Sequence, residues 1–258
     1  MNKETNVRDT LNQHLKELRL PSIRECYEQY AHQAEVSSLS YEKYLLEVLA
    51  RECEVRHQKR IEKLLKTSHL PLEKALSNFD LKRLPQKVAQ QINHLLMGDF
   101  LGSSENVLVF GNPGSGKTHL VCAVAQELIY KGYRLYFNTC SLLIQDLLKA
   151  KQELRLSRFL KKLSYFEAII IDDIGYVQQS REEMEVLFTL LAERYERGSI
   201  ILTSNLPFSK WETIFKDPTT TAAAVDRLVH HSVIIELNLP SYRMEEAKSR
   251  MNTEIQEE

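Results

Sequence analysis

The chain has 258 residues and a formal net charge of −1 at pH 7, with 27% charged and 43% hydrophobic residues. This composition is ordinary for a soluble globular protein with one large domain, or with one domain and a small accessory one. The near-zero net charge excludes a uniformly basic nucleic-acid-binding protein, so any DNA contact must come from local basic patches.

The four cysteines lie far apart and form no C-x-x-C pair: Cys26, Cys53, Cys122 and Cys140. This spacing argues against a cysteine zinc site and against a disulfide framework, and it suits a reducing cytosol. Residues 1–10 are polar and charged, and no apolar run approaches the length of a membrane span. We therefore expect a cytoplasmic protein with no signal peptide and no membrane partner.

Residues 1 to about 100 show helical periodicity and no convincing strand. A first helix is expected before Pro21, and Ser22 is a candidate N-cap for a second. Ser40 is a candidate N-cap for a third helix, from Tyr41 to about Lys66. One face of this third helix carries five basic residues, namely Arg56, Lys59, Arg60, Lys63 and Lys66. A solvated face explains these charges better than a patch for phosphates or an acidic partner, because charge runs usually face water.

Prolines and turn-forming residues interrupt the stretch from His69 to Pro85, which predicts a linker. A helix from Gln86 to Leu96 is expected next, and residues 98–104 lead from it into the first strand. No strand is predicted in this part of the chain.

A glycine-rich stretch, residues 111–118, fits the phosphate-binding pattern G-x-x-x-x-G-K-[ST]. It lies between an apolar strand, 107–110, and a helix that ends near Tyr130. Backbone N–H groups of such a loop curl around a phosphate, and the helix N-terminus adds partial positive charge. Lys117 is expected to reach the β- and γ-phosphates of ATP, and the Thr118 hydroxyl to ligate Mg²⁺. The expected nucleotide-binding residues here are Gly111, Asn112, Pro113, Gly114, Ser115, Gly116, Lys117, Thr118 and His119.

A basic segment follows a predicted strand over 133–137. A helix is expected from Thr139 or Ser141 to about Lys149, and another over 151–163, with Lys151, Arg155, Arg158 and Lys162 on one side. Between residues 149 and 162 there are six basic residues, including Lys161, against a single acid, Glu153. Because so little acid balances them, phosphate-backbone contact is slightly favoured over an ordinary solvated helix. The DNA-binding candidates are Lys149, Lys151, Arg155, Arg158 and Lys162.

Two carboxylates, Asp172 and Asp173, end a continuous apolar run that begins at Ala168. Such a run indicates a strand buried on both faces of a parallel sheet, and ligands bind at the C-terminal ends of these strands. Asp172 is suited to hold Mg²⁺ through water, and Asp173 to polarise an attacking water.

Asn205 follows the next predicted strand, 199–203, which comes after an amphipathic helix over 182–197. Its amide can orient the water or touch the γ-phosphate; the alternative is a turn residue before Pro207. Trp211 is expected to pack rather than to bind a ligand.

The C-terminal part predicts a helix over 222–231, capped by residues 219–221, and a last strand over 233–237. His230 and His231 are adjacent and therefore expected on different sides of that helix, which argues against a shared metal ion. A short charged helix is expected from Ser241 onward.

Alternating strands and helices predict an α/β fold, with a five-stranded parallel sheet flanked by helices. A small all-α domain precedes it. The expected division is a helical N-terminal partner or oligomerisation domain (1–68), a linker with a lead-in helix (69–104) and an ATPase domain (105–258).

These motifs together resemble the AAA+ ATPases, and within them the IstB/DnaC branch. That branch contains the helper ATPases of two-gene insertion sequences and the loaders of the replicative helicase. Residues 111–118 look like Walker A, residues 169–173 like Walker B, and residues 203–205 like sensor I. The resemblance covers roughly residues 105–245.

Two arginines acquire candidate roles from this resemblance. The segment 224–231 is similar to the branch's arginine-finger segment, which makes Arg227 the candidate finger. Residues 241–243 resemble the segment that bears the sensor II arginine, which makes Arg243 a candidate nucleotide contact.

The sequence departs from the wider AAA+ pattern in two ways. Walker B ends in Asp-Asp rather than Asp-Glu, and the shorter side chain suggests slow basal hydrolysis. The chain also leaves no room after about residue 245 for a C-terminal lid domain, which makes the sensor II role of Arg243 less secure. Both features are typical of the IstB/DnaC branch.

The resemblance implies an ATPase with ATP and Mg²⁺ as cofactors, held in an ATP-dependent ring or spiral of identical subunits. It would bind duplex DNA without sequence preference and recruit a transposase. The implied catalytic residues are Lys117, Asp172, Asp173, Asn205 and Arg227. Alternatives are a helicase loader that binds single-stranded DNA, a monomeric P-loop kinase for a small molecule, and a binding module with a structural ATP site.

Overall fold

The computed structural model describes residues 3–175, 180–211, 218–242 and 244. The chain forms two compact units, Met1–Lys63 and Leu64–Glu258. Within the described ranges, no helix is both long enough and apolar enough to cross a membrane.

The first unit consists of α1 (Lys3–Glu17), α2 (Pro21–Val36) and the first part of α3 (Tyr41–Ser68). The three predicted N-terminal helices are thus confirmed. Leu15, Ile23 and Val48 form a small buried cluster, against which partly buried tyrosines pack. Ser40 caps α3 as predicted, since its Oγ accepts a hydrogen bond from the Lys43 amide at 3.3 Å.

The predicted cap of the second helix is wrong. Helix α2 begins at Pro21, and Ser22 is a buried residue inside its first turn. The carboxylate of Glu52, on α3, accepts hydrogen bonds from the amides of Ser22 at 2.8 Å and Ile23 at 3.2 Å. Arg56 in turn donates to Glu52 at 2.7 Å. A residue thirty positions away therefore supplies the oxygen that a local cap would have given.

The second unit opens with the segment predicted as a linker. Two short 3₁₀ helices, Leu76–Asn78 and Leu81–Arg83, precede α4 (Gln86–Met97) and α5 (Asp99–Gly102). The predicted helix from Gln86 is confirmed. The segment is held against α6 (Lys117–Tyr130) by the Gln126 amide, which donates to the carbonyls of Pro71 and Leu72.

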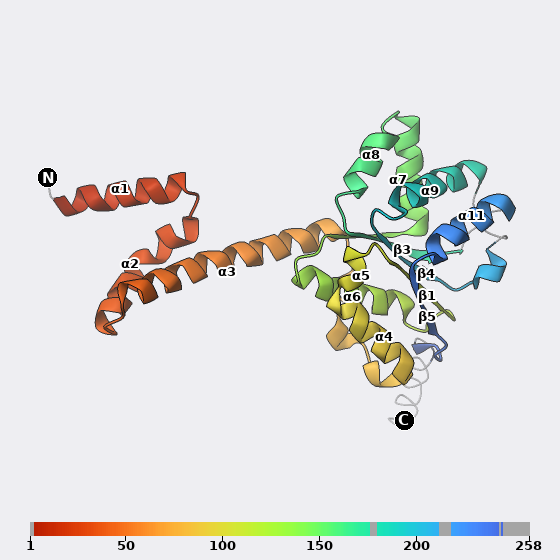
Figure 1. Ribbon diagram of the computed structural model, residues 1–258, viewed down its shortest axis with the longest axis horizontal. Coiled ribbons are helices and arrows are strands. Elements are labelled where there is room, and N and C mark those ends of the chain that lie inside the picture. The colour runs from red at the N-terminus through yellow and green to blue at the C-terminus, as the bar shows by residue number, and fades with distance from the viewer. Residues whose placement is uncertain (1–2, 176–179, 212–217, 243, 245–258) are drawn as a thin grey trace, which may run out of the picture. The chain divides into compact units, whose positions relative to one another are not determined.

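A five-stranded sheet forms the centre of this unit (Figure 1). The strands, all parallel, are β1 (Asn106–Gly111), β2 (Leu135–Thr139), β3 (Ala168–Ile174), β4 (Ser199–Ser204) and β5 (Ser232–Leu237), in the order β2-β3-β4-β1-β5. The predicted fold class and strand number are confirmed. The second strand starts two residues later than expected.

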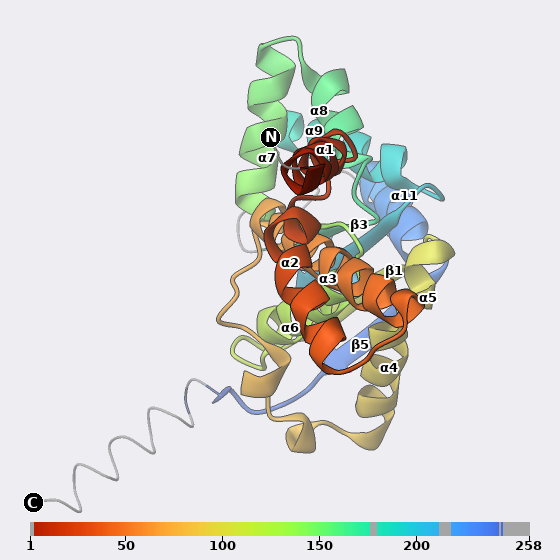
Figure 2. The same cartoon turned by 90° about the vertical axis from the view of Figure 1, so that its left-hand side faces the viewer.

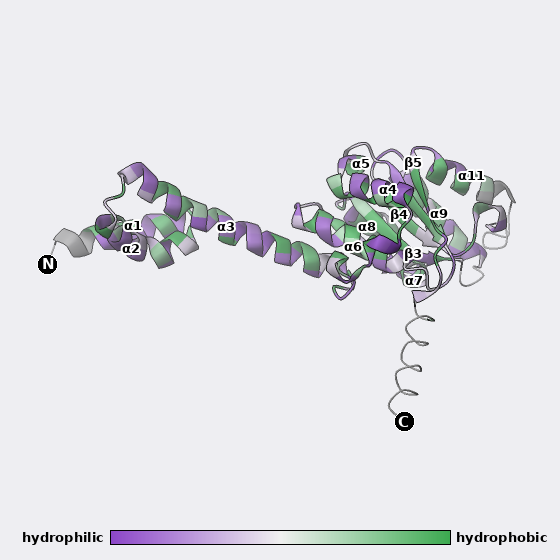
Figure 3. Cartoon of the chain, turned by 90° about the horizontal axis from the view of Figure 1, so that it is seen from below, coloured by the Kyte–Doolittle hydropathy of each residue, from purple (hydrophilic) through white to green (hydrophobic). Residues whose placement is uncertain are grey.

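Helices cover both faces of the sheet (Figures 1 and 2). Helices α4 and α6 lie on one side. On the other side lie α7 (Cys140–Gln152), α9 (Arg181–Arg194) and α11 (Pro218–Val229), with α8 (Leu156–Leu163) against α7. The strands are hydrophobic along most of their length, whereas α3 alternates between hydrophilic and hydrophobic residues (Figure 3). Residues buried on both sheet faces explain why the strands read as continuous apolar runs.

Trp211 is fully buried, as predicted. Its ring lies 5.0 Å from that of Phe208, whose ring is 4.6 Å from that of Phe110, on the P-loop strand. The indole N–H donates to the Leu206 carbonyl at 3.1 Å. This aromatic group fixes the chain that follows β4.

The predicted basic helix over 151–163 is two elements. Helix α7, capped by Thr139, continues to Gln152, and the chain then turns through Leu154, at φ +55°, before α8 begins at Leu156. The DNA-binding candidates are therefore divided: Lys149 and Lys151 lie on α7, Arg155 is at the N-cap position of α8 without a side-chain cap, and Arg158 and Lys162 lie on α8. A non-glycine residue in the left-handed region ends one helix and re-aims the next.

A buried arginine joins α8, α9 and the sheet. Arg194 is only 4% exposed, and its guanidinium donates to the carbonyls of Phe166, Glu167 and Ser199 at 2.8–3.1 Å. Burial lowers the pKa of Arg194 to about 10, which keeps the side chain charged at neutral pH. A Cβ atom on Gly198 would lie 2.2 Å from its Nη2.

Helix α11 starts at Pro218, so residues 219–221 lie inside it rather than capping it, and it ends at Val229. His230 and His231 follow in the turn before β5, with His231 at φ +59°. Their rings are 4.1 Å apart between centroids. The prediction that they point to different sides of one helix is wrong, because neither belongs to the helix.

Candidate functional site

The glycine-rich loop joins β1 to the N-terminus of α6, as the motif predicts. Gly116 precedes the helix at φ +94°, a conformation that side chains disfavour. A Cβ atom on Gly114 would lie 2.1 Å from the Ser241 Oγ. The chain after β5 thus passes close to the loop, and Tyr242 donates its amide hydrogen to the Gly114 carbonyl at 3.0 Å.

Lys117 is the first residue of α6 and is only 6% exposed. Its ammonium donates to the Gly111 carbonyl at 2.9 Å and to the Asn112 carbonyl at 3.0 Å. These bonds hold the cation at the mouth of the loop, beside the amide groups of the first helical turn. The position suits contact with a bound polyphosphate.

A β-bulge aims the two carboxylates of β3. Ile171 pairs with Leu202 and Ile174 with Ser204, so Asp172 and Asp173 together lie opposite a single residue of β4, Thr203. Asp173 has φ +60°, and its amide donates to the Thr203 hydroxyl at 2.9 Å. Successive strand residues normally point to opposite faces, whereas both of these face one cavity.

Asp172 lies between two hydroxyl groups. Its Oδ1 accepts from Thr118 at 2.9 Å and from Thr203 at 2.6 Å. The side chain is nearly buried, at 3% exposure. The Thr118 hydroxyl and the Asp172 carboxylate are hard oxygen donors of the type that Mg²⁺ takes, and one helix and one strand fix them side by side.

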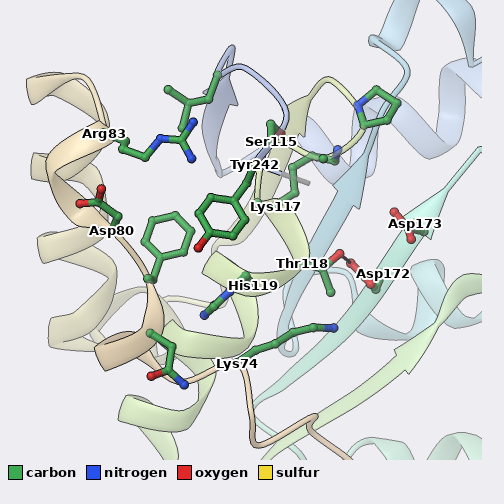
Figure 4. A pocket seen from close by; sticks show the side chains of 16 residues that line it. Lys74, Asp80, Arg83, Ser115, Lys117, Thr118, His119, Asp172, Asp173 and Tyr242 are labelled. Atoms are coloured by element: carbon green, nitrogen blue, oxygen red, sulfur yellow. Dashed lines mark hydrogen bonds between the residues drawn. The ribbon is translucent and has the colours of Figure 1, made fainter. Parts of the chain in front are cut away.

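These groups line a cavity of about 340 Å³ (Figure 4). The predicted residues Pro113, Gly114, Ser115, Gly116, Lys117, Thr118, His119, Asp172 and Asp173 all contribute to its wall. The wall also contains residues that the motif analysis missed, namely Lys74, Asn78, Phe79, Asp80, Arg83, Leu239 and Tyr242. Most of them come from the predicted linker, where prolines indicated only irregular chain.

One side of the cavity is aromatic. The rings of Phe79 and His119 meet edge to face at 5.3 Å, and His119 Nε2 lies 3.1 Å from the Ala75 carbonyl oxygen. The Arg83 guanidinium lies 5.5 Å from the centre of the Tyr242 ring. Flat side chains of this kind suit a planar base. In Figure 4, Lys74 extends on the opposite side toward Thr118.

The loop also contains an orphaned polar atom. Ser115 is 4% exposed, and its Oγ is buried with no hydrogen-bond partner among the described residues. Buried hydroxyls without partners are costly, and a phosphate oxygen is an acceptor that would satisfy this one. The loop therefore fits a nucleoside triphosphate, and the adjoining oxygens of Thr118 and Asp172 fit its metal ion.

Four of the nucleotide-site candidates within the described residues do not line the cavity, namely Gly111, Asn112, Asn205 and Arg227. Arg227 is not among the described residues that line the cavity; its guanidinium donates to the Ala223 carbonyl at 2.9 Å and lies 4.9 Å from the Phe188 ring centre. Asn205 also does not line it, and its Oδ1 is buried with no hydrogen-bond partner in the described part of the chain. Arg243 is outside the described residues.

The basic candidates remain at the surface. Lys149, Arg155, Arg158 and Lys162 are exposed, while Lys151 is half-buried. Two of the five are in ion pairs, Lys151 with Glu185 at 3.0 Å and Arg155 with Glu153 at 3.5 Å. Surface pairs of this kind contribute little stability and can be exchanged for phosphate contacts.

Comparison with known proteins finds a matching family model and similar sequences. A family model described as IstB-like ATP binding protein matches residues 13–250. An insertion-sequence ATP-binding protein of Sinorhizobium fredii (strain NBRC 101917 / NGR234) is 41% identical over 234 residues, which cover 90% of this chain and 78% of that protein. The insertion sequence IS21 ATP-binding protein of Pseudomonas aeruginosa is 39% identical over 234 residues, covering 91% and 88%.

Solved structures share the fold at low sequence identity. The DnaC helicase loader aligns with a TM-score of 0.55 and 20% identity over 64% of this chain and 96% of that one. AMPPCP-bound DnaA from Aquifex aeolicus aligns with a TM-score of 0.56 and 20% identity over 72% and 56%. Taken with the sequence matches, this likeness means that the chain belongs to the family of IstB-like ATP-binding proteins and has the AAA+ fold seen in DnaC and DnaA.

Proposed function

We propose that this chain is an ATP-dependent DNA-binding ATPase that assembles on duplex target DNA and recruits and activates a transposase. Its relatives are named as insertion-sequence ATP-binding proteins, which supports a role in transposition. The division into an N-terminal partner domain (1–68), a linker (69–104) and an ATPase domain (105–258) is part of this proposal.

One observation carries the proposal: most candidate nucleotide-binding residues line one cavity, whereas the candidate arginine finger, Arg227, is not among the described residues that line it. The phosphate loop, the Thr118–Asp172 pair and Asp173 meet in one wall, while Arg227 lies on α11, away from it. A site that lacks an arginine finger of its own is completed when a neighbouring subunit supplies that arginine, as in ATPases whose arginine finger acts in trans. ATP then joins subunits, and its hydrolysis releases them.

In this proposal each group has one task. The loop amides and Lys117 bind the β- and γ-phosphates, and Thr118 and Asp172 hold the metal ion, which supplies charge neutralisation on the phosphate oxygens. Asp173 accepts a hydrogen bond from the water that attacks the γ-phosphorus. The bond from phosphorus to the bridging oxygen breaks, ADP leaves, and the proton of the water passes through Asp173 to solvent.

The shared site is tested by mixing two inactive variants. Asp173→Asn lacks the water-polarising group but keeps its arginine, and Arg227→Ala lacks the arginine but keeps its site. Random assembly pairs an intact site with an intact arginine at about a quarter of the interfaces, because each interface is heterologous. We expect ATPase activity to reappear on mixing. Activity that stays absent, while each variant still assembles, would refute a shared site.

The duplex role is tested by light scattering of the chain with ATP and short DNA at low salt. We expect a large assembly only with ATP and duplex. Assembly on single strands alone would favour a helicase loader, whose bases would stack on aromatic side chains. A monomer with normal ATPase activity in every condition would favour a small-molecule kinase.

A further inference from the structure

A second group of titratable side chains lies at the ends of α9 and α11. Glu196 follows α9 in the turn that leads to β4, and His230 and His231 follow α11 in the turn that leads to β5. One potential ligand atom from each residue lies within 4.8 Å of the other two. All three residues are exposed, so an ion could reach them from solvent.

The sheet topology brings these turns together. Strands β4 and β5 flank β1, and all three run parallel, so the turns that enter β4 and β5 meet at the N-terminal edge. The P-loop lies at the opposite, C-terminal edge. Glu196 at φ +57° and His231 at φ +59° both adopt the left-handed region, and the His231 carbonyl accepts from the Asn106 amide at 2.9 Å.

His230 is held by a further contact. Its Nδ1 lies 3.1 Å from the Tyr195 hydroxyl. When Nδ1 carries the proton and donates to that oxygen, the Nε2 lone pair is left for a ligand. Metal-binding histidines almost always have their second nitrogen held in this way, which fixes the tautomer and the ring orientation.

We propose that Glu196, His230 and His231 form a binding site for a divalent transition-metal ion of the zinc type. Two imidazoles and one carboxylate match the preference of Zn²⁺, whereas Mg²⁺ and Ca²⁺ take oxygen ligands. Zinc–ligand bonds of about 2 Å require ligand atoms roughly 3.4 Å apart in a tetrahedron. The three ligand atoms would therefore have to move closer together than their present separations of up to 4.8 Å. A fourth position remains for water.

The ion would tie the end of α9 to the end of the helix that carries Arg227. The Asn106 side chain already fastens this end, since its Nδ2 donates to the carbonyls of Arg227 and Leu228 at 3.3 Å and 3.1 Å. A metal link one turn further on would stiffen the same junction. The site itself does not depend on the proposed function, because its residues do not line the nucleotide cavity.

The test uses the full chain without a polyhistidine tag. Zn²⁺ is titrated in competition with a chromogenic chelator, and Co²⁺ is titrated by visible absorption. We expect one ion per chain and a cobalt spectrum of low coordination number. Glu196→Gln and His231→Asn should each weaken binding about tenfold or more, and Tyr195→Phe should weaken it less. The melting temperature of the wild type should rise with Zn²⁺, whereas that of Glu196→Gln and His231→Asn should rise much less.

Matched controls sit nearby or elsewhere on the surface. Glu193→Gln removes an exposed carboxylate one turn before Glu196, and His57→Asn removes an exposed histidine of α3. Both should bind zinc as the wild type does. The proposal is wrong if the wild type binds no stoichiometric ion, or if Glu196→Gln and His231→Asn bind normally. Loss of binding only in Cys53→Ser would place the ion on an exposed thiol and also overturn it.

Discussion

Thr203 connects the two carboxylates of the candidate ATPase site. Its hydroxyl donates to Asp172 and accepts from the Asp173 amide, so one atom orients both acids. Thr203→Val keeps the shape and removes both bonds. We expect the ATPase rate constant to fall by about 10- to 100-fold, as when other groups that orient metal ligands are removed. Nucleotide affinity should change less, since the P-loop is untouched.

The matched control is Thr189→Val. Among the described residues, the hydroxyl of Thr189 donates to the Glu185 carbonyl of its own helix, at 2.7 Å. Steady-state ATPase assays and fluorescent-nucleotide titration compare the two variants. Equal activity of Thr203→Val and the control would show that the hydroxyl does not position the acids.

Glu52 makes the N-terminal unit sensitive to acid. Burial alone would raise the pKa of this carboxyl, but the Arg56 guanidinium and the amides of Ile23 and Ser22 outweigh it and lower the pKa. A lowered pKa means that the carboxylate stabilises the fold fully above about pH 4.5, the ordinary value, and loses this contribution as the pH falls through the folded-state value.

We therefore expect Glu52→Gln to destabilise the chain by about 1–3 kcal/mol at pH 7. At a pH well below 4.5 the difference from the wild type should shrink, because the stabilisation by the ionised carboxylate is lost as the pH falls. Thermal unfolding followed by circular dichroism at both pH values measures this. Glu54→Gln, at an exposed surface pair, serves as control. A loss that is the same at both pH values would contradict the assignment.

At the scale of elements, α8 presents basic side chains to solvent. Arg158 and Lys162 lie on it and are exposed. If each contacts a phosphate, its replacement by alanine should reduce the slope of log affinity against log salt by about one. Fluorescence anisotropy with a short duplex at several salt concentrations provides the slopes. Lys87→Ala, at an exposed position of α4, should leave the slope unchanged, and an unchanged slope for the α8 variants would exclude phosphate contact by α8.

The spacing of hydrophobic residues predicted most helices and strands, because burial against the core imposes that spacing. The strands are apolar along most of their length since both sheet faces are covered, and this signal is local. The bulge at Asp173 was not predictable in this way, because it depends on a hydroxyl thirty residues away in β4. The aromatic wall around Phe79 was also missed, since its role arises only when the segment packs on α6. The turn at Leu154, which divides the basic segment, was not predictable from the residue type, because leucine favours helices.

At the scale of the whole molecule, the reactivity of the cysteine thiols measures how readily the chain unfolds around them. Burial raises the pKa of Cys122 to about 12, against a lowering influence of Lys74, and burial also raises the pKa of Cys140 to about 12. Both thiols are therefore protonated and shielded at neutral pH. Cys53 is exposed. We expect an alkylating reagent to modify Cys53 rapidly and the two buried thiols only through opening of the second unit, Leu64–Glu258.

Mass spectrometry of peptides after timed alkylation distinguishes these thiols. Saturating ATP and Mg²⁺ should slow the modification of Cys122, on the P-loop helix, because ligand binding stabilises the folded state. Labelling of Cys53, on α3, should not change. If Cys122 reacted as fast as Cys53, the P-loop helix would not be packed as described.

The order of the strands required the structure, although their number and direction did not. Alternation of strands and helices predicts a parallel sheet but fixes neither which strands are neighbours nor which turns meet at its edges. The approach of Ser241 to Gly114 and that of Glu196 to His231 both follow from that order. The motifs identified the phosphate-binding residues of the P-loop, whereas the strand order determines which distant residues lie beside the P-loop.

The contact between Arg194 and Gly198 constrains how this protein can change through evolution. A methyl group at position 198 would occupy the space of the guanidinium, so Gly198→Ala is tolerated only if the arginine is replaced as well. A shorter side chain at position 194 would remove donors from carbonyls of β4 and of the segment before β3. In lineages of this family the two positions should therefore vary together, and a double substitution should cost less than the sum of its parts.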